Sequence, residues 1–200
     1  MGIYTIIYLV NSLGFATNKR SKKIINFFVI ALLIFISGTR YYMGGSDVLV
    51  YENVYNRVPS VSTVLLYLFM GINQGVNTNY ETGFILICAI IKRLGFSYFG
   101  FTLVFATLFY LFMYKGLKEF VADWAPFWAL FMYKIMFYNT FISIRQGLTM
   151  AIFCYALKYI RDKKIVKYFI WSFIAFQIHR GAIILFNIYQ CRQNSSNMLL

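Results

Sequence analysis

The chain has 200 residues, of which 60% are hydrophobic, 21% are aromatic and only 12% are charged. A soluble domain carries about 25% charged residues, so this composition excludes an ordinary soluble protein and predicts an all-α, polytopic membrane protein. The formal net charge of +13 would suit nucleic acid. The basic residues, however, form short clusters between apolar runs, where they set membrane topology, and we expect no nucleic-acid partner.

The apolar runs predict about six transmembrane spans in a single domain over residues 1–200. The first run, residues 3–15, is followed by a basic cluster rather than preceded by one. That polarity is the reverse of a cleaved signal peptide, so we expect a first span with its N-terminus outside. The other spans are predicted at residues 24–37, 99–114, 125–142, 148–160 and 168–189.

A polar and aromatic stretch, residues 38–95, separates the second span from the third and predicts an external loop region. Within it, residues 64–72 and 83–91 are apolar but too short to cross a bilayer alone, which takes about 20 residues. We interpret them as re-entrant or interfacial half-helices, whose irregular backbone must be covered by protein or water.

Counting basic residues beside the apolar runs gives a topology. If both or neither of the half-helices cross, ten basic residues face the cytoplasm and five face outside, as the positive-inside tendency requires. The cytoplasmic set is Lys19, Arg20, Lys22, Lys23, Lys115, Lys118, Arg161, Lys163, Lys164 and Lys167, and the external set is Arg40, Arg57, Lys92, Arg93 and Arg145. The outer set is mostly arginine, the better bidentate phosphate ligand.

Arg145 lies between two apolar runs. An arginine at membrane depth costs about 2.5 to 3.5 kcal/mol on insertion scales, so its guanidinium usually faces an anion, a cavity or a polar wall. The span that begins at Gln146 would point its N-terminal amides at the same place, and Gly147 would let a ligand approach the backbone. This pattern predicts a diphosphate site. The alternative is that Arg145 pairs with Asp47 or Glu81, or reaches lipid headgroups.

His179 and Arg180 interrupt the last apolar run beside a glycine. As the lone histidine, His179 is either a general base or phosphate donor, or a hydrogen-bonded packing residue. Arg180 favours function, because two polar groups at such a break are costly unless used. With one histidine, six acids and three scattered cysteines, we expect no metal site and no cofactor.

The mouth of the second span concentrates glycine, aromatic and charged residues, from Arg40 to Tyr51. The aromatic residues form either a membrane belt or a platform for sugar rings. In the second case Asp47 or Glu81 would accept sugar hydroxyls, and either acid would serve as the base for an attacking hydroxyl.

Four short motifs occur in order along residues 38–184 and together resemble the EpsG family. They are Gly44-Gly45-Ser46-Asp47 with Tyr51, Glu81-x-Gly83, Ile144-Arg145-Gln146-Gly147, and His179 with Gly181. The resemblance implies a GT-C-like polymerase or glycosyltransferase of exopolysaccharide, capsule or O-antigen assembly. It would act on polyprenyl-diphosphate-linked saccharides, outside the bacterial cytoplasmic membrane.

The resemblance also implies roles for residues. Arg145 and His179 match the family's Arg-Gln and His motifs, and Asp47 matches its Gly-Thr-Asp motif with Ser46 in place of threonine. These three are the predicted catalytic residues. The predicted substrate-binding residues are Arg40, Tyr51, Glu81, Gln146, Gly147 and Arg180.

Family members usually continue through further spans, so we expect an incomplete domain that needs its missing C-terminal half or other polysaccharide-assembly proteins. Three alternatives stay open. In the first the chain is a membrane acyltransferase with His179 as base, in the second a non-catalytic transport or assembly subunit, and in the third an inactive fragment.

Overall fold

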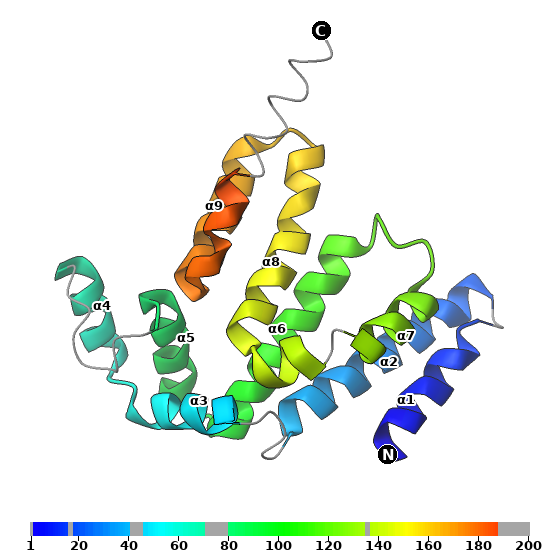
Figure 1. Cartoon of the computed structure of the whole chain (residues 1–200), viewed down its shortest axis with the longest axis horizontal. Coiled ribbons are helices and arrows are strands. Elements are labelled where there is room, and N and C mark those ends of the chain that lie inside the picture. Colours follow the sequence, from blue (N-terminus) through cyan, green and yellow to red (C-terminus); the bar gives the residue numbers. More distant parts are fainter. Residues whose placement is uncertain (1, 16–17, 41–45, 71–79, 135–136, 188–200) are drawn as a thin grey trace, which may run out of the picture.

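A computed structural model describes residues 2–15, 18–40, 46–70, 80–134 and 137–187, and every regular element within them is helical (Figure 1). The prediction of an all-α chain is therefore confirmed. The elements are α1 Gly2–Leu13, α2 Lys19–Thr39, α3 Ser46–Arg57, α4 Val61–Met70, α5 Thr82–Arg93, α6 Tyr98–Leu117, α7 Trp124–Lys134, the π-helix η1 Phe137–Ile142, α8 Ile144–Arg161, α9 Ile165–Ile178 and the 3₁₀ helix η2 Arg180–Ile183.

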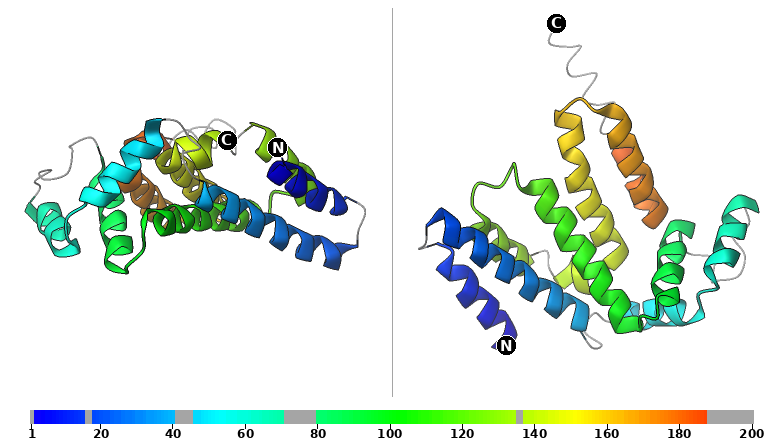
Figure 2. Two further views of the ribbon diagram at one scale, coloured as in Figure 1. Left: turned by 90° about the horizontal axis from the view of Figure 1, so that it is seen from below. Right: turned by 180° about the vertical axis from the view of Figure 1, so that it is seen from behind.

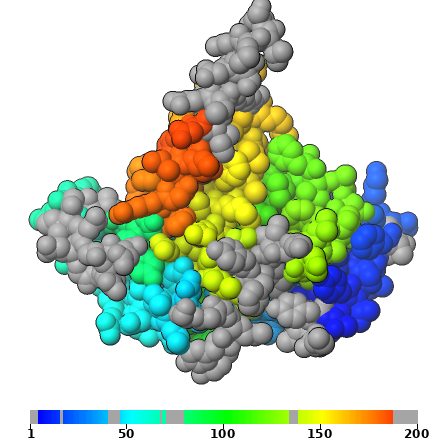
Figure 3. All heavy atoms as spheres, in the orientation of Figure 1, coloured from blue at the N-terminus to red at the C-terminus, as the bar shows by residue number. Residues whose placement is uncertain are grey.

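The long helices lie side by side in one layer, with α6 at its centre (Figures 1 and 2). Helix α6 packs between α2 and α8, while α1 packs on α2 and α9 packs on α8. Beyond α9, α5 packs on its neighbour α4. The space-filling view shows α8 and α9 standing between the α3–α5 region on one side and α1, α2 and α7 on the other (Figure 3).

Helix α6 contributes aromatic residues to two apolar cores, one near its beginning and one near its end. Near its beginning, Phe101 and Phe105 pack with Phe84 of α5 at ring-centroid distances of 6.3 and 5.8 Å. Near its end, Tyr110 packs with Trp128 of α7 at 6.0 Å. The first core holds α3, α5, α8 and α9 together, and the second holds α1, α2 and α7.

Two described helices, α2 and α6, have both the length and the apolarity of a membrane span, with mean hydropathies of 1.7 and 1.4. Helix α9 is apolar but shorter. The prediction of about six spans is thus supported for two. Helices α1 and α7 are only 12 and 11 residues long, and α8 includes Arg145, Gln146, Lys158 and Arg161 in its 18 residues.

The remaining predicted runs have different outcomes. The run at 125–142 divides into α7 and η1 on either side of residues 135–136, which lie outside the described residues. The run at 168–189 is interrupted where the sequence predicts, because α9 ends at Ile178. The two predicted half-helices are present as α4 and α5, and α3 is a further helix that the sequence analysis assigned to a loop.

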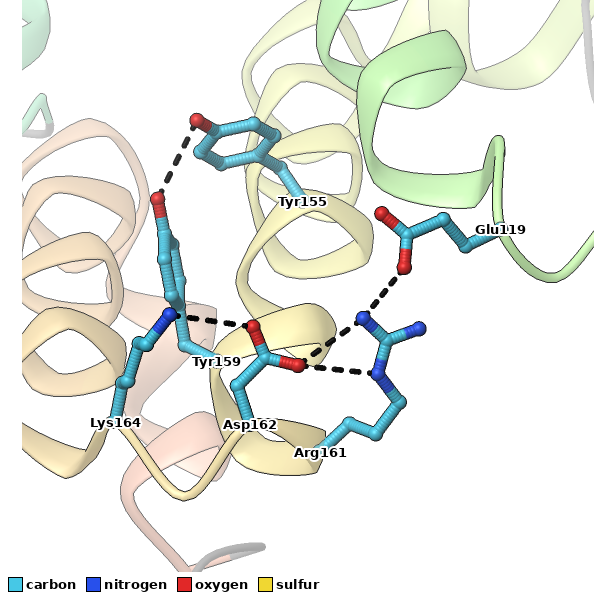
Figure 4. A network of polar contacts seen from close by, with 6 residues as sticks. All are labelled: Glu119, Tyr155, Tyr159, Arg161, Asp162 and Lys164. Carbon is cyan, nitrogen blue, oxygen red and sulfur yellow. Dashed lines mark hydrogen bonds and ion pairs between the residues drawn. The ribbon is translucent and has the colours of Figure 1, made fainter.

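The turn between α8 and α9 is held to the end of α6 by charged side chains (Figure 4). Arg161 Nη2 lies 2.5 Å from Glu119 Oε2 and 3.0 Å from Asp162 Oδ1. Lys164 Nζ lies 3.6 Å from Asp162 Oδ2. The hydrogen bond from Arg161 lowers the pKa of Asp162 below its usual value. This basic turn lies at the edge of the layer opposite α3 and the beginning of α6 (Figures 1 and 2).

Candidate functional site

Glu81 brings together three segments that are far apart in the sequence. Its Oε2 forms an ion pair with Arg145 Nη1 at the beginning of α8. Its Oε1 accepts a 2.7 Å hydrogen bond from the backbone N–H of Arg180 and lies 3.7 Å from His179 Nδ1. The side chains of Glu81 and Arg145 are only 10% and 15% exposed, so this is a largely buried ion pair. We call Glu81, Arg145, His179 and Arg180 the Glu81 cluster.

A glycine in the first turn of α5 explains how Glu81 reaches the end of α9. A Cβ atom at Gly83 would lie 2.6 Å from both the Cβ and the carbonyl oxygen of Gln177. Such a distance is a clash, so only glycine lets the two helix ends approach this closely. Beyond Ile178 the backbone of His179 is extended, with φ −154° and ψ 124°, and the chain then turns into η2.

Aromatic rings surround the Arg145 guanidinium. Its carbon Cζ lies 4.4 Å from the ring centroid of Tyr80, 5.4 Å from that of Phe84 and 5.9 Å from that of Tyr51. Rings at these distances attract a cation, by about 0.5 to 2 kcal/mol each. Nε of Arg145 is buried and has no hydrogen-bond partner. The guanidinium is therefore held by Glu81 and the rings while one of its donors is left for another acceptor.

Sequence reasoning identified Tyr51 but missed Tyr80 and Phe84. The signal was present, because both lie close to the acid already singled out, one residue before it and three residues after it. Positions three residues apart in a helical turn share a face. Aromatic residues flanking a candidate carboxylate at these spacings would have indicated rings around its cationic partner.

Burial lowers the pKa of His179 below its usual value, and the nearby charge of Arg145 lowers it further, while Glu81 acts in the opposite direction. The imidazole is therefore neutral at neutral pH and able to accept a proton. Its Nδ1 is buried and has no hydrogen-bond partner. Buried polar nitrogens are usually hydrogen-bonded, so this atom has unused capacity for a partner.

Arg40 lies in a second polar site, formed by the end of α2 and by η1. The residue is only 5% exposed. Its Nη1 donates to the carbonyl oxygens of Ser37 and Thr140, the first at 2.8 Å, whereas Nε and Nη2 are buried without partners. Burial lowers the pKa of Arg40 to about 10, so the group stays charged at neutral pH. The adjoining cavity of about 10 Å³ has room for about one water molecule.

The other predicted site residues lie around these two arginines. Asp47, in the first turn of α3, is partly exposed and lies near Tyr80. Burial raises the pKa of Tyr80, and Tyr51 and Asp47 contribute to the shift. Ser46 begins α3, while Gly44 and Gly45 of the same motif lie outside the described residues.

Gln146 is exposed, whereas Gly147 is buried against η1. A Cβ atom at Gly147 would lie 2.1 Å from the backbone oxygen of Asn139. The glycine thus allows close approach by the chain's own backbone, where the sequence analysis expected a ligand. The reason is the π-helix, which brings the Asn139 carbonyl onto the first turn of α8.

The described residues form a helical protein with two helices able to span a membrane, and the site combines a buried ion pair, aromatic rings around Arg145 and a histidine at the helix ends. The model of the EpsG family matches residues 23–200, and the chain belongs to the EpsG family. The family and the apolar helices indicate a Wzy-like membrane protein of polysaccharide synthesis. No curated protein and no solved structure matches the chain.

Proposed function

We propose that this chain binds the donor in a polysaccharide polymerase reaction that extends a glycan from a polyprenyl-diphosphate-linked saccharide. The observation that carries the proposal is the Glu81 cluster. It holds a cation, a carboxylate and a neutral histidine together within a family of polysaccharide synthesis. Those are the groups that a glycosyl transfer from a diphosphate needs.

In the proposed reaction, a hydroxyl of the acceptor sugar attacks the anomeric carbon of the donor. The bond from that carbon to the diphosphate oxygen breaks, and the polyprenyl diphosphate leaves with the electron pair. The proton of the hydroxyl passes to a base, for which neutral His179 is the first candidate and Asp47 the second. Arg145 stabilises the negative charge that grows on the leaving group.

The ion pair with Glu81 leaves Arg145 able to bind the donor. A guanidinium has five N–H donors in a fixed fork, and Glu81 is bonded to Nη1. The remaining donors include the unpartnered Nε. With two arginines, one carboxylate and a neutral histidine, the cluster keeps one net positive charge. Glu81 therefore orients Arg145 without cancelling the attraction for a diphosphate.

Exposed groups beside the cluster supply further contacts to the donor. The side chains of Arg180 and Gln146 are exposed, and we assign them to the diphosphate and the first sugar. Two buried groups lie farther in: Tyr51 contributes an aromatic face, and Arg40 a second cation beyond η1. These roles rest on position and chemistry, and each is open to single substitution.

The proposed location is the bacterial cytoplasmic membrane, with the Glu81 cluster on the external side and the N-terminus outside. Supporting this, the lysine-rich α8–α9 turn lies at the edge opposite α3 (Figure 1). Other polysaccharide-assembly proteins are the proposed partners.

Arg145→Lys tests the proposal, because lysine keeps the charge but loses the bidentate fork. In membranes that contain the chain and are supplied with a polyprenyl-diphosphate oligosaccharide, we expect turnover to fall about 10²- to 10³-fold. Arg161→Lys is the matched control, since Arg161 is exposed at the other end of α8, and it should leave turnover unchanged. Parental rates for both Arg145→Lys and Arg145→Ala, with normal membrane insertion, would refute the proposal.

A further inference from the structure

A cavity of about 420 Å³ lies away from the Glu81 cluster, where the beginning of α2, the end of α6 and the beginning of α7 meet. Its lining combines lysines with large aromatic rings. The lysines are Lys19, Lys22, Lys23 and Lys118, and the aromatic residues are Tyr114, Trp124 and Trp128. Neither the sequence analysis nor the proposed function gives these lysines a role beyond membrane topology.

Three polar contacts between distant segments build this cavity. Lys22 Nζ lies 2.5 Å from Asp123 Oδ2, and so ties α2 to the beginning of α7. Asn11 Nδ2 donates to the carbonyl oxygen of Ala125 at 2.7 Å, which ties α1 to α7. Deeper in the cavity, Trp128 Nε1 donates to Asn26 Oδ1 at 2.6 Å. The walls are therefore fixed by two buried hydrogen bonds and a partly exposed ion pair as well as by apolar packing.

The charges around the cavity do not balance. Asp123 is the acid in its lining, and the hydrogen bond from Lys22 lowers the pKa of that carboxyl. Among the ion pairs of the described residues, Lys19, Lys23 and Lys118 have no carboxylate partner. Three lysines thus remain to attract an anion at one rim. Lysine is a common phosphate ligand, acting as a point charge.

The aromatic residues of the lining favour a ligand that is apolar at one end. Tyr114 and Trp124 pack at 4.9 Å, and Trp124 stacks on Trp128 at 5.5 Å. Tryptophan and tyrosine gather at the headgroup level of membranes, where one end of the ring is apolar and the other is wet. On the same helix α2, the side chains of Phe27 and Phe28 are 69% and 56% exposed. An acyl chain would cover these exposed rings.

We propose that this cavity binds the phosphate of an anionic glycerophospholipid headgroup. The lysines sit at the ends of α2 and α6, the two helices able to span a membrane, so they lie at headgroup depth. Basic pockets between transmembrane helices bind anionic headgroups in this way. A free phosphate would contact the same lysines, but it would gain no binding energy from the aromatic residues of the lining or from the exposed rings of α2.

Binding is measured on the purified full chain in detergent, where membrane orientation does not enter. Native mass spectrometry compares adducts of phosphatidylglycerol and phosphatidylcholine added in equal amounts. We expect the parental chain to prefer phosphatidylglycerol. One lysine near an anionic headgroup contributes about five-fold in affinity, so Lys19→Gln/Lys23→Gln/Lys118→Gln should lose about a hundred-fold.

The matched control is Lys163→Gln/Lys164→Gln/Lys167→Gln, which removes the same charge from the α8–α9 region. It should keep the phosphatidylglycerol preference. Equal losses in both triple variants would mean that net charge alone attracts the lipid, and would overturn the proposal. If the first triple variant fails to fold, Lys118→Gln alone should still lose about five-fold, and no loss there would also overturn it.

Inorganic phosphate distinguishes the two sources of the ligand. In competition with phosphatidylglycerol, we expect a large excess of phosphate to displace little lipid from the parental chain. Displacement at equal concentrations would show that the cavity takes a soluble phosphate, and would overturn the lipid assignment. Neither outcome depends on the polymerase reaction, because the cavity and the Glu81 cluster share no residue.

Discussion

Arg145 and Arg40 are both largely buried, yet the chain satisfies their charges in different ways. Arg145 pairs with the Glu81 carboxylate and is surrounded by three aromatic rings. Arg40 instead donates to two backbone carbonyls and leaves two nitrogens without partners. A carboxylate offsets a full charge, whereas two carbonyl dipoles offset only part of it. Arg145 is therefore positioned by its partner, while Arg40 has more unused capacity for an anion or a water.

The first turn of α8 separates the two sites. Ile144 lines the small cavity beside Arg40, and the next residue, Arg145, faces Glu81. Consecutive residues of a helix point about 100° apart, so one turn serves two environments. Two arginines that are both largely buried therefore require different tests, one on the ion pair of Arg145 and one on the carbonyl contacts of Arg40.

The largest expected effect comes from breaking the buried ion pair. Arg145→Met leaves Glu81 charged, buried and without its cation, which should lower the free energy of unfolding by about 3 to 5 kcal/mol. Replacing both partners, as Arg145→Met with Glu81→Leu, should recover most of that loss. Unfolding by a denaturing detergent measures both variants. If the double variant is as unstable as the single one, the ion pair is not what positions Arg145.

Gly147→Ala tests whether η1 must contact α8 for both sites to form. The added methyl group would meet the Asn139 carbonyl, and overpacking of this kind costs about 1 to 3 kcal/mol. Gly116→Ala is the matched control, because its Cβ would lie 2.5 Å from the backbone of Cys154 near the other end of α8. We expect both variants to lose stability but only Gly147→Ala to lose polymerase turnover. If the two variants have equal turnover, the contact between η1 and α8 is not required for the proposed site.

Arg40→Met is the substitution that corresponds to Arg145→Met at the second site. It removes hydrogen bonds to two carbonyls but leaves no uncompensated charge, so we expect a loss of about 1 kcal/mol in the same assay. A loss as large as that of Arg145→Met would contradict the comparison. It would indicate an anion held by Arg40 in the purified protein.

The smallest effect is the pH dependence from His179. Burial lowers the pKa of this imidazole in the folded chain, so the unfolded chain binds more protons as the pH falls. Stability should be fully present above the ordinary histidine pKa of about 6.5 and should decline as the pH is lowered through it. In His179→Gln this decline should disappear. A decline of the same size in the variant would assign it to other groups.

Much of the Glu81 cluster could be predicted residue by residue. Arg145, His179 and Arg180 were identified from their polarity within apolar runs and Glu81 as one of few acids, and Asp47 and Glu81 were the two candidate acids for pairing with Arg145. The sequence could not choose between them. The choice depends on Gly83 meeting Gln177, a contact between segments almost a hundred residues apart.

Helix boundaries and lengths were predicted less well. The run at 125–142 is uniformly apolar, and composition alone gives no sign that it forms α7 and then a π-helix. The short stretch at α3 contains Asp47, Glu52 and two asparagines, so its weak apolar pattern indicated a loop. In the structure its apolar face is covered by α5 and α6.

The sequence by itself determined that this protein is helical and apolar and that its basic residues lie in clusters between the apolar runs. It also showed that a few polar residues within those runs need polar partners. Composition and periodicity are properties of residues that are close together in the sequence, and they do not depend on the tertiary structure. Only the tertiary structure decided which partner each residue has. Buried charges are satisfied by whichever acceptor the packing brings within about 3 Å. For Arg145 that acceptor is a carboxylate 64 positions away, and for Arg40 it is a carbonyl 100 positions away.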